Sequence, residues 1–326
     1  MANSGRKINY SIRPAKNIER KMFRDILLRL STCFSFYDYQ YIGFGSKYFV
    51  DFVLMHRFLH INDMISIEND VHNRNRYKFN SPYSCIDIRF GNASDVLPQI
   101  NLDRKSIVWL DYDSRFSKNI LGDISTLASS LPLDSIVCLT YNSQAYKRDE
   151  LLKTDQNNQN NQHLYKDKFI ELFGEENIPA AFDERGWSNN EIFSKFIRKT
   201  IVNQINKDLS TRKLAGENNI LKQILYFDYS DGSFMSSLAF IICSTELESK
   251  VSTCNLEAFP FYKTNDESYR IEAPNLTTKE IRYLSEKMPA EINDIDFSQT
   301  GLSESDVNNF CKNYKYYPTF SEIEIF

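Results

Sequence analysis

The chain has 326 residues, of which 42% are hydrophobic and 25% are charged, so it can form one large domain or one domain with a substantial appendage. Its mean hydropathy of -0.45, its polar start and its lack of a long apolar run argue against a membrane span and an export signal. Six cysteines without a C-x-x-C pair fit a reducing compartment, and a net charge of -4 gives no overall attraction to nucleic acid. We therefore expect a cytoplasmic protein without a membrane partner.

The first thirty residues are rich in basic side chains and predict an amphipathic helix over residues 14–31. Pro14 is well placed at a helix start, and apolar residues recur after it at helical spacing. Eight lysines and arginines stand here against only Glu19 and Asp25. A solvated helix face is the more ordinary interpretation of this charge, and contact with a polyanion such as nucleic acid is the alternative.

Short apolar runs then alternate with helical segments. A helix is predicted over residues 46–60. The predicted strands lie at residues 39–44, 64–68, 84–90, 107–110 and 136–140. Strands that alternate with helices in this way indicate an α/β fold with a parallel sheet and helices on both faces.

The alternation breaks over about residues 143–222, where a polar tract at 156–162 and helical periodicity predict a helical insertion. Two apolar runs follow, at residues 224–229 and 238–243. The turn Asp231-Gly232 joins them so tightly that these two strands must be antiparallel.

The chain is therefore divided into a basic helical segment at residues 1–34, an α/β domain at residues 35–245 that contains the insertion, and an extension at residues 246–326. Within the extension, Thr277 followed three residues later by Glu280 predicts the capped start of a helix. The extension is a candidate surface for a protein partner.

Candidate ligand-binding residues follow the predicted strands. Gly43-Phe44-Gly45-Ser46 ends the first strand, and its glycines permit a tight turn and close approach of a ligand to the backbone. Glu68 ends the second strand 23 residues after Gly45, where an acid is placed to accept hydrogen bonds from ribose hydroxyls. The plain alternatives are a structural strand-to-helix turn and an exposed acid at a strand end.

Polar residues also follow the fourth and fifth strands. Asp111 and Asp113 lie at the carboxyl edge, where such sheets bind ligands, and either could act as a general base. Tyr141 and Asn142 end the fifth strand. Tyr141 could line a substrate pocket or simply pack in the core.

In its five βα-type strands, closing hairpin and ordered motifs, the sequence resembles class I, Rossmann-like methyltransferases that use S-adenosylmethionine (SAM). Over most of its length it also resembles an uncharacterised O-methyltransferase family, in particular at Arg13-Pro14-Ala15-Lys16, Glu19-Arg20 and Leu276-Thr277. The resemblance implies a sheet of five parallel-type strands closed by an antiparallel hairpin, with SAM as the cofactor. The residues that would hold SAM are Gly43, Phe44, Gly45 and Ser46 for its methionine part, Glu68 for the ribose, Asn92 and Ala93 for the adenine, and Asp111 for the ammonium group.

The same resemblance bears on a metal ion and on the acceptor. Metal-dependent relatives carry a carboxylate where this chain has Asp111, and Asn142 stands in the region of a further ligand, but Thr140-Tyr141 stands where a second acid is expected. A divalent metal is therefore kept as an alternative, and no metal ligand is assigned. The chain lacks the Asp/Asn-Pro-Pro-Tyr/Phe and Pro-Cys sequences that suit transfer to exocyclic amines and to cytosine carbon 5. Oxygen acceptors remain by elimination.

Three functional hypotheses follow from these features. The first is methyl transfer from SAM to an unidentified small or macromolecular acceptor, with Asp111 and Asp113 in catalysis and Tyr141 and Asn142 near the acceptor. The second is a non-catalytic scaffold or partner subunit that keeps the fold. The third is a methyltransferase directed at nucleic acid, for example in phage defence, that touches phosphates through its basic N-terminus.

Overall fold

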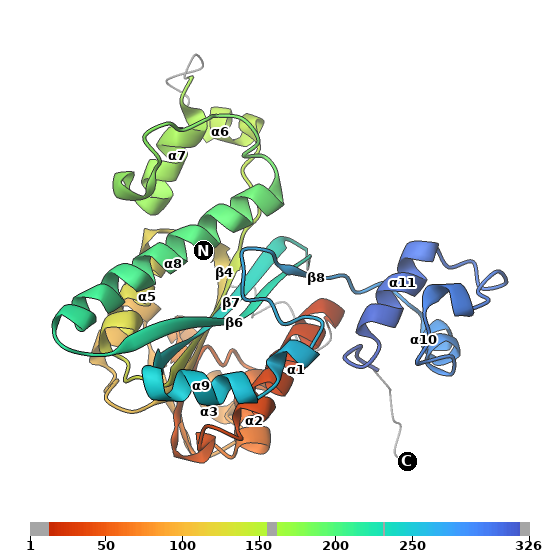
Figure 1. Cartoon of the computed structure of the whole chain (residues 1–326), viewed down its shortest axis with the longest axis horizontal. Helices are drawn as coiled ribbons and strands as arrows, with labels where there is room; N and C mark the ends of the chain where they lie inside the picture. Colours follow the sequence, from red (N-terminus) through yellow and green to blue (C-terminus); the bar gives the residue numbers. More distant parts are fainter. Residues whose placement is uncertain (1–12, 155–161, 231, 320–326) are drawn as a thin grey trace.

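The computed structural model describes residues 13–154, 162–230 and 232–319, and within these ranges eight strands form one sheet at the centre of the molecule (Figure 1). The order of the strands across the sheet is β3-β2-β1-β4-β5-β7-β6-β8. Their bounds are β1 (Gln40–Gly43), β2 (Asp63–Glu68), β3 (Ile86–Phe90), β4 (Ser106–Arg115), β5 (Ser135–Asn142), β6 (Asn219–Ser230), β7 (Phe234–Ser244) and β8 (Tyr269–Ile271).

The pairing of the strands confirms the predicted fold. Strands β1 to β5 are parallel to one another, and β7 is antiparallel to both β5 and β6. The three-residue strand β8, which pairs in parallel with β6, is not among the predicted strands. The strand order reverses between β1 and β4, and open α/β sheets bind their ligands at the carboxyl ends of the strands on either side of such a reversal.

Helices cover both faces of the sheet, because alternate residues of a strand point to opposite sides. On β4, Ile107 and Trp109 pack with α1 and α2, whereas Val108 and Leu110 pack with α5 and α8. The helix bounds are α1 (Pro14–Leu30), α2 (Val50–Leu59), α3 (Arg74–Asn80), α4 (Ala93–Val96), α5 (Lys118–Ser130), α6 (Arg148–Thr154), α7 (Leu164–Phe173), α8 (Asn190–Leu214), α9 (Thr245–Thr253), α10 (Thr278–Ser285) and α11 (Glu304–Asn313).

Helix α1 belongs to the core. Its Phe23 ring meets the ring of Trp109 edge to face, with 5.1 Å between the centroids. Lys16 and Arg20 are also buried, so the interpretation of a solvated basic face was wrong for these two residues, and neither can reach a polyanion. The nucleic-acid contact predicted for the rest of the basic segment stays a prediction, and residues 1–12 lie outside the described ranges.

The helix predicted from residue 46 begins four residues later, at Val50. Ser46 and Phe49 both have a φ of 49°, in the left-handed region that an α-helix cannot include. Residues 44–49 therefore form a separate loop between β1 and α2, which we call the glycine loop.

Between β5 and β6 the chain forms α6, α7 and α8, in agreement with the predicted helical insertion. In Figure 1, α6 and α7 project from the sheet, while α8 lies along it. Most of the polar tract at residues 156–162 falls outside the described ranges.

The C-terminal helices α10 and α11 lie in a lobe beside the sheet (Figure 1). Helix α10 begins with the predicted capping box, in which the Thr277 hydroxyl accepts from the Glu280 amide and the Glu280 carboxylate accepts from the Thr277 amide at 2.7 Å. The lobe touches α1, where Lys21 Nζ donates to the carbonyl oxygen of Tyr316 at 3.0 Å. The predicted boundaries at residues 34 and 245 and the role of the lobe as a partner surface stay predictions.

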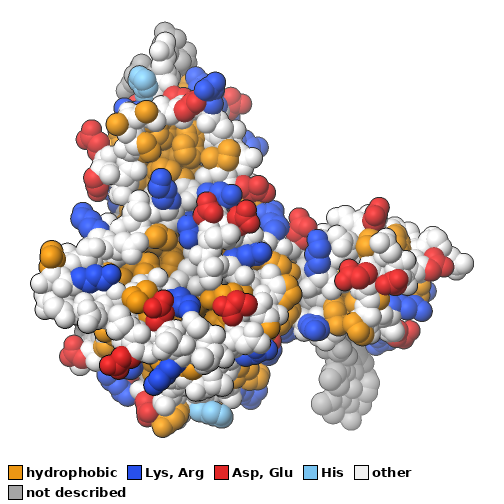
Figure 2. Space-filling view, viewed as in Figure 1, with side chains coloured by type: hydrophobic (Ala, Val, Ile, Leu, Met, Phe, Trp, Pro, Cys, Tyr) orange, Lys and Arg blue, Asp and Glu red, His pale blue; other side chains and the backbone are white. Residues whose placement is uncertain are grey.

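None of the helices in the described ranges combines the length and the apolar character that a bilayer crossing requires. Figure 2 shows basic and acidic side chains intermingled on one face of the molecule.

Candidate active site

The glycine loop lies close against β2 and β4. A Cβ atom added to Gly45 would stand 2.6 Å from Ser66 Oγ, and one added to Gly43 would stand 3.1 Å from the Trp109 carbonyl oxygen. The Gly45 amide donates to Ser66 Oγ at 3.1 Å. Both predicted glycines are therefore required by the close approach of the chain to itself, whatever else the loop holds.

Glu68, at the end of β2, lies beneath this loop. Its side chain accepts from Ser66 Oγ at 2.8 Å and from the amides of Gly45 and Ser46, and the residue is only 5% exposed. Burial raises the pKa of Glu68 from 4.5 to about 7, although these hydrogen bonds oppose the rise. At neutral pH the carboxyl group is therefore close to the midpoint of its titration.

The segment after β3 lies against the end of β2, because the Gly91 amide donates to the Glu68 carbonyl oxygen at 3.0 Å. Asn92 is exposed and precedes the short helix α4, and its amide nitrogen donates to Asp95 at 3.2 Å. The two predicted nucleoside contacts, Glu68 and Asn92, thus come from neighbouring strand ends at one edge of the sheet.

Asp111, on β4, is paired with a lysine from α1. Lys16 Nζ lies 3.0 Å from Asp111 Oδ2 and 2.7 Å from Glu19 Oε2. Burial lowers the pKa of Lys16, but the charges of Asp111 and Glu19 outweigh burial and raise it well above its usual value. Lys16 is therefore an ammonium ion, and it lies 5.1 Å from the centre of the Trp109 ring.

Five acidic and basic side chains form one group at this place, which we call the α1 charge cluster. Besides the Lys16 pairs, it includes a 2.6 Å ion pair between Arg20 and Asp51 at the start of α2. The electric fields of Asp111 and Glu19 also act on Arg20. The members of the cluster are Lys16, Glu19, Arg20, Asp51 and Asp111.

Glu19 is the most deeply buried carboxylate of the α1 charge cluster. It accepts hydrogen bonds from the hydroxyls of Thr140 at 3.2 Å, Tyr229 at 3.2 Å and Ser237. Sequence reasoning assigned no role to Lys16, Glu19 or Arg20. The only signal was the motif from Arg13 to Arg20, and the burial of its charges depends on partners far along the chain.

The other predicted site residues are placed as follows. Asp113 is exposed, and the Asn142 side-chain oxygen accepts from the Gln144 amide at 2.8 Å. Phe44 packs edge to face on Tyr112, with 5.2 Å between the centroids. Tyr141 is fully buried, so it lies in the core and not on a pocket wall.

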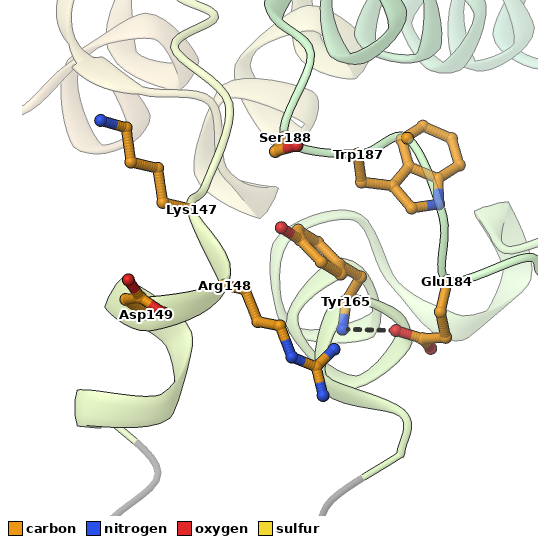
Figure 3. A pocket seen from close by; sticks show the side chains of 8 residues that line it. Lys147, Arg148, Asp149, Tyr165, Glu184, Trp187 and Ser188 are labelled. Carbon is orange, nitrogen blue, oxygen red and sulfur yellow. Dashed lines mark hydrogen bonds between the residues drawn. The ribbon is translucent and has the colours of Figure 1, made fainter.

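Two further observations bear on metals and substrates. Within the described ranges, no three His, Cys, Asp or Glu side chains gather as metal ligands would. A hollow of about 340 Å³ lies farther out in the insertion (Figure 3). Figure 3 shows Lys147 and Arg148 at the start of α6 and Tyr165 on α7 around this hollow, and Glu184 accepts from the Tyr165 amide at 2.9 Å.

The strand order and the antiparallel β7 define the class I methyltransferase fold. A family model described as "Putative O-methyltransferase" matches residues 8–325. The chain therefore belongs to this O-methyltransferase family.

Solved structures show a general likeness of fold. The SAM-bound O-methyltransferase TomG from Streptomyces achromogenes is 12% identical, with 67% of this chain and 79% of that chain covered at a TM-score of 0.33. An arsenic(III) SAM methyltransferase from Chlamydomonas reinhardtii is 10% identical, with 64% of each chain covered at a TM-score of 0.36. A search among curated proteins found no match.

Proposed function

We propose that the protein is a SAM-dependent methyltransferase that transfers a methyl group to an oxygen atom of its acceptor. The donor lies across the carboxyl ends of β1, β2 and β4. The observation that carries this proposal is Glu68, a buried carboxyl group beneath the glycine loop with a pKa raised to about 7.

Such a group costs stability. The rise in the pKa of Glu68 from 4.5 to about 7 corresponds to about 3 kcal/mol against the ionised folded state. Carboxyl groups with strongly raised pKa values concentrate at binding and catalytic sites, where ligand binding offsets the loss of stability. A ribose supplies two further hydroxyl donors to a carboxylate at this position, since within the described part of the chain only one side-chain hydroxyl, that of Ser66, reaches it.

The residues present fit the parts of SAM. Glu68 would accept from the ribose hydroxyls, the exposed Asn92 would meet the adenine, and Asp111 would meet the ammonium group. When bound, SAM supplies an activated methyl group on a sulfonium. The protein contributes mainly alignment of the acceptor with that group, which can account for several kcal/mol of the barrier.

Asp111 and Asp113 take different roles in this proposal. Asp111 already forms an ion pair with the buried ammonium of Lys16, so we assign it to recognition of a positive group rather than to removal of a proton. Asp113, two residues farther along β4 and exposed, remains the candidate general base. The hollow of the insertion, reached from the end of β5, is the candidate region for the acceptor.

Calorimetry with SAM and S-adenosylhomocysteine tests the proposal. We expect both ligands to bind the wild-type protein. Their Kd for Glu68→Gln should be higher by about tenfold or more, because a charged acceptor of two hydrogen bonds is lost. Binding to the wild type should strengthen as the pH rises through 7, as Glu68 ionises, whereas Glu68→Gln should show no such rise.

Thermal unfolding supplies the control for folding. Because the folded-state pKa of Glu68 lies above its unfolded value of 4.5, the folded protein binds more protons between pH 4.5 and 7, and wild-type stability falls as the pH rises through that window. Glu68→Gln should therefore be more stable than the wild type at pH 8. The proposal is wrong if folded wild-type protein gives no heat with either ligand.

A further inference from the structure

The α1 charge cluster is not electrically balanced. It holds two cations, Lys16 and Arg20, against three carboxylates, Glu19, Asp51 and Asp111, which leaves one negative charge in excess. The side chains of the first four are between 1% and 8% exposed, whereas that of Asp111 is 22% exposed. Among the described residues, Asp111 is therefore the member of the cluster through which the excess charge can meet a ligand.

One carboxylate oxygen of Asp111, Oδ1, is not the atom that pairs with Lys16. Its Oδ2 is paired with Lys16, and among the described residues no other side chain forms an ion pair or hydrogen bond with its carboxylate. Asp111 follows Trp109 on β4 by two residues, and Trp109 is the register partner of Gly43 at the end of β1. The free oxygen therefore belongs to the edge of the sheet where the strand order reverses.

Glu19 shares the Lys16 ammonium with Asp111 and thereby reduces how far Lys16 neutralises Asp111. Lys16 Nζ is closer to Glu19, at 2.7 Å, than to Asp111, at 3.0 Å. Three hydroxyl donors fix Glu19 in place. If Glu19 carried no charge, Lys16 would neutralise Asp111 alone, and Asp111 would attract a cation less strongly.

We propose that Glu19 is a positioning residue: it never touches the ligand, but because it shares the Lys16 ammonium with Asp111, Lys16 does not fully neutralise Asp111 toward the primary ammonium group of the donor. This inference rests on the proposed function. It gives the motif from Arg13 to Arg20 a role in ligand selection: the site distinguishes nucleosides with an amino-acid end from those without one.

The test compares two ligands in calorimetry. S-adenosylhomocysteine carries the ammonium group, and 5′-methylthioadenosine has the same nucleoside and a thioether but no amino-acid end. For Glu19→Gln we expect the Kd of S-adenosylhomocysteine to rise about tenfold, which is the order of one partly screened charge interaction. The Kd of 5′-methylthioadenosine should stay within about twofold of wild type, which a general loss of structure would not allow.

Asp228→Asn is the matched control. Asp228 is likewise a buried carboxylate held by three hydroxyls, but it belongs to the opposite face of the sheet. This variant should leave the Kd of both ligands at the wild-type value.

Three results would overturn or remove the inference. An unchanged ratio of the two Kd values in folded Glu19→Gln overturns it while the proposed function stands. If Glu19→Gln does not fold, Asp111→Asn replaces it, and an unchanged ratio there overturns the inference together with the assignment of Asp111 to the ammonium group. If the wild-type protein binds neither ligand, the proposed function itself fails.

Discussion

Glu19 and Asp228 are two carboxylates buried beside β7, on opposite faces of the sheet, and the protein holds them in different ways. Both accept a hydrogen bond from neighbouring residues of β7: Ser237 donates to Glu19, and Ser236 donates to Asp228 at 2.5 Å. Glu19 also has the ammonium of Lys16 at 2.7 Å. Asp228 has only serine hydroxyls as hydrogen-bond donors among the described residues.

The difference shows what neutral donors can do for a buried charge. Burial raises the pKa of Asp228 even though three serine hydroxyls lower it. Hydroxyl groups therefore do not fully replace the water that a carboxylate loses. An ammonium ion replaces more of it, but the two partners then depend on each other, and removal of either leaves an uncompensated charge. Glu19 thus has an ion pair in addition to its hydroxyl donors, whereas Asp228 has serine hydroxyls alone as hydrogen-bond donors among the described residues.

The largest effect in this comparison is expected for Lys16→Met. It leaves Glu19 and Asp111 without their shared cation, and we expect the free energy of unfolding to fall by about 3–5 kcal/mol in urea titrations. Lys21→Met is the control on the same helix, because Lys21 donates to a carbonyl oxygen and forms no ion pair with the described residues, and it should cost about 1 kcal/mol. Equal losses in the two variants would show that the cluster contributes no special stability.

Ser236→Ala and Ser237→Ala form a matched pair on adjacent residues of one strand. Ser236→Ala should cost more, about 2–3 kcal/mol, because among the described residues Asp228 then keeps only two serine hydroxyls as hydrogen-bond donors and has no ion pair. Ser237→Ala should cost about 1 kcal/mol, because Glu19 keeps Lys16 and two other hydroxyls. Chemical denaturation of both variants decides the order, and the reverse order would contradict the comparison.

The sequence predicts the sheet well because the strands are local patterns. Apolar runs of strand length and a single Asp-Gly turn are sufficient to place the five parallel strands and the hairpin. The start of α2 was not predictable, because the left-handed residues Ser46 and Phe49 follow from the packing of the glycine loop onto Ser66, which is far along the chain.

The candidate site was predictable in its positions and not in its electrostatics. The sequence selects Asp111 and Glu68 because they follow or end apolar runs of strand length; the structure places both on strands, and their roles in binding stay predictions. The burial of Lys16 and Glu19 was not, because charged residues on an amphipathic helix are usually solvated, and here their partners come from β4, β5, β6 and β7. Tyr141 alternates with Thr140 on β5 and therefore points to the opposite face, which a short apolar run does not reveal.

The smallest effect on stability is expected for Asp228→Asn. The change in the pH dependence of stability in this variant is the most direct test of the difference between Asp228 and Glu19. Because the folded-state pKa of Asp228 is raised above its usual 3.8, the folded protein binds more protons above pH 3.8, and Asp228 lowers stability as the pH rises through its folded pKa. An asparagine side chain at this position cannot ionise, so the variant should lose this decline. At neutral pH the change in the free energy of unfolding should be less than about 1 kcal/mol, since the removed charge penalty offsets the weaker hydrogen bonds. Unfolding titrations between pH 4 and 7 measure the slope, and parallel curves for the two proteins would mean that the serines already satisfy the buried carboxylate without a cation.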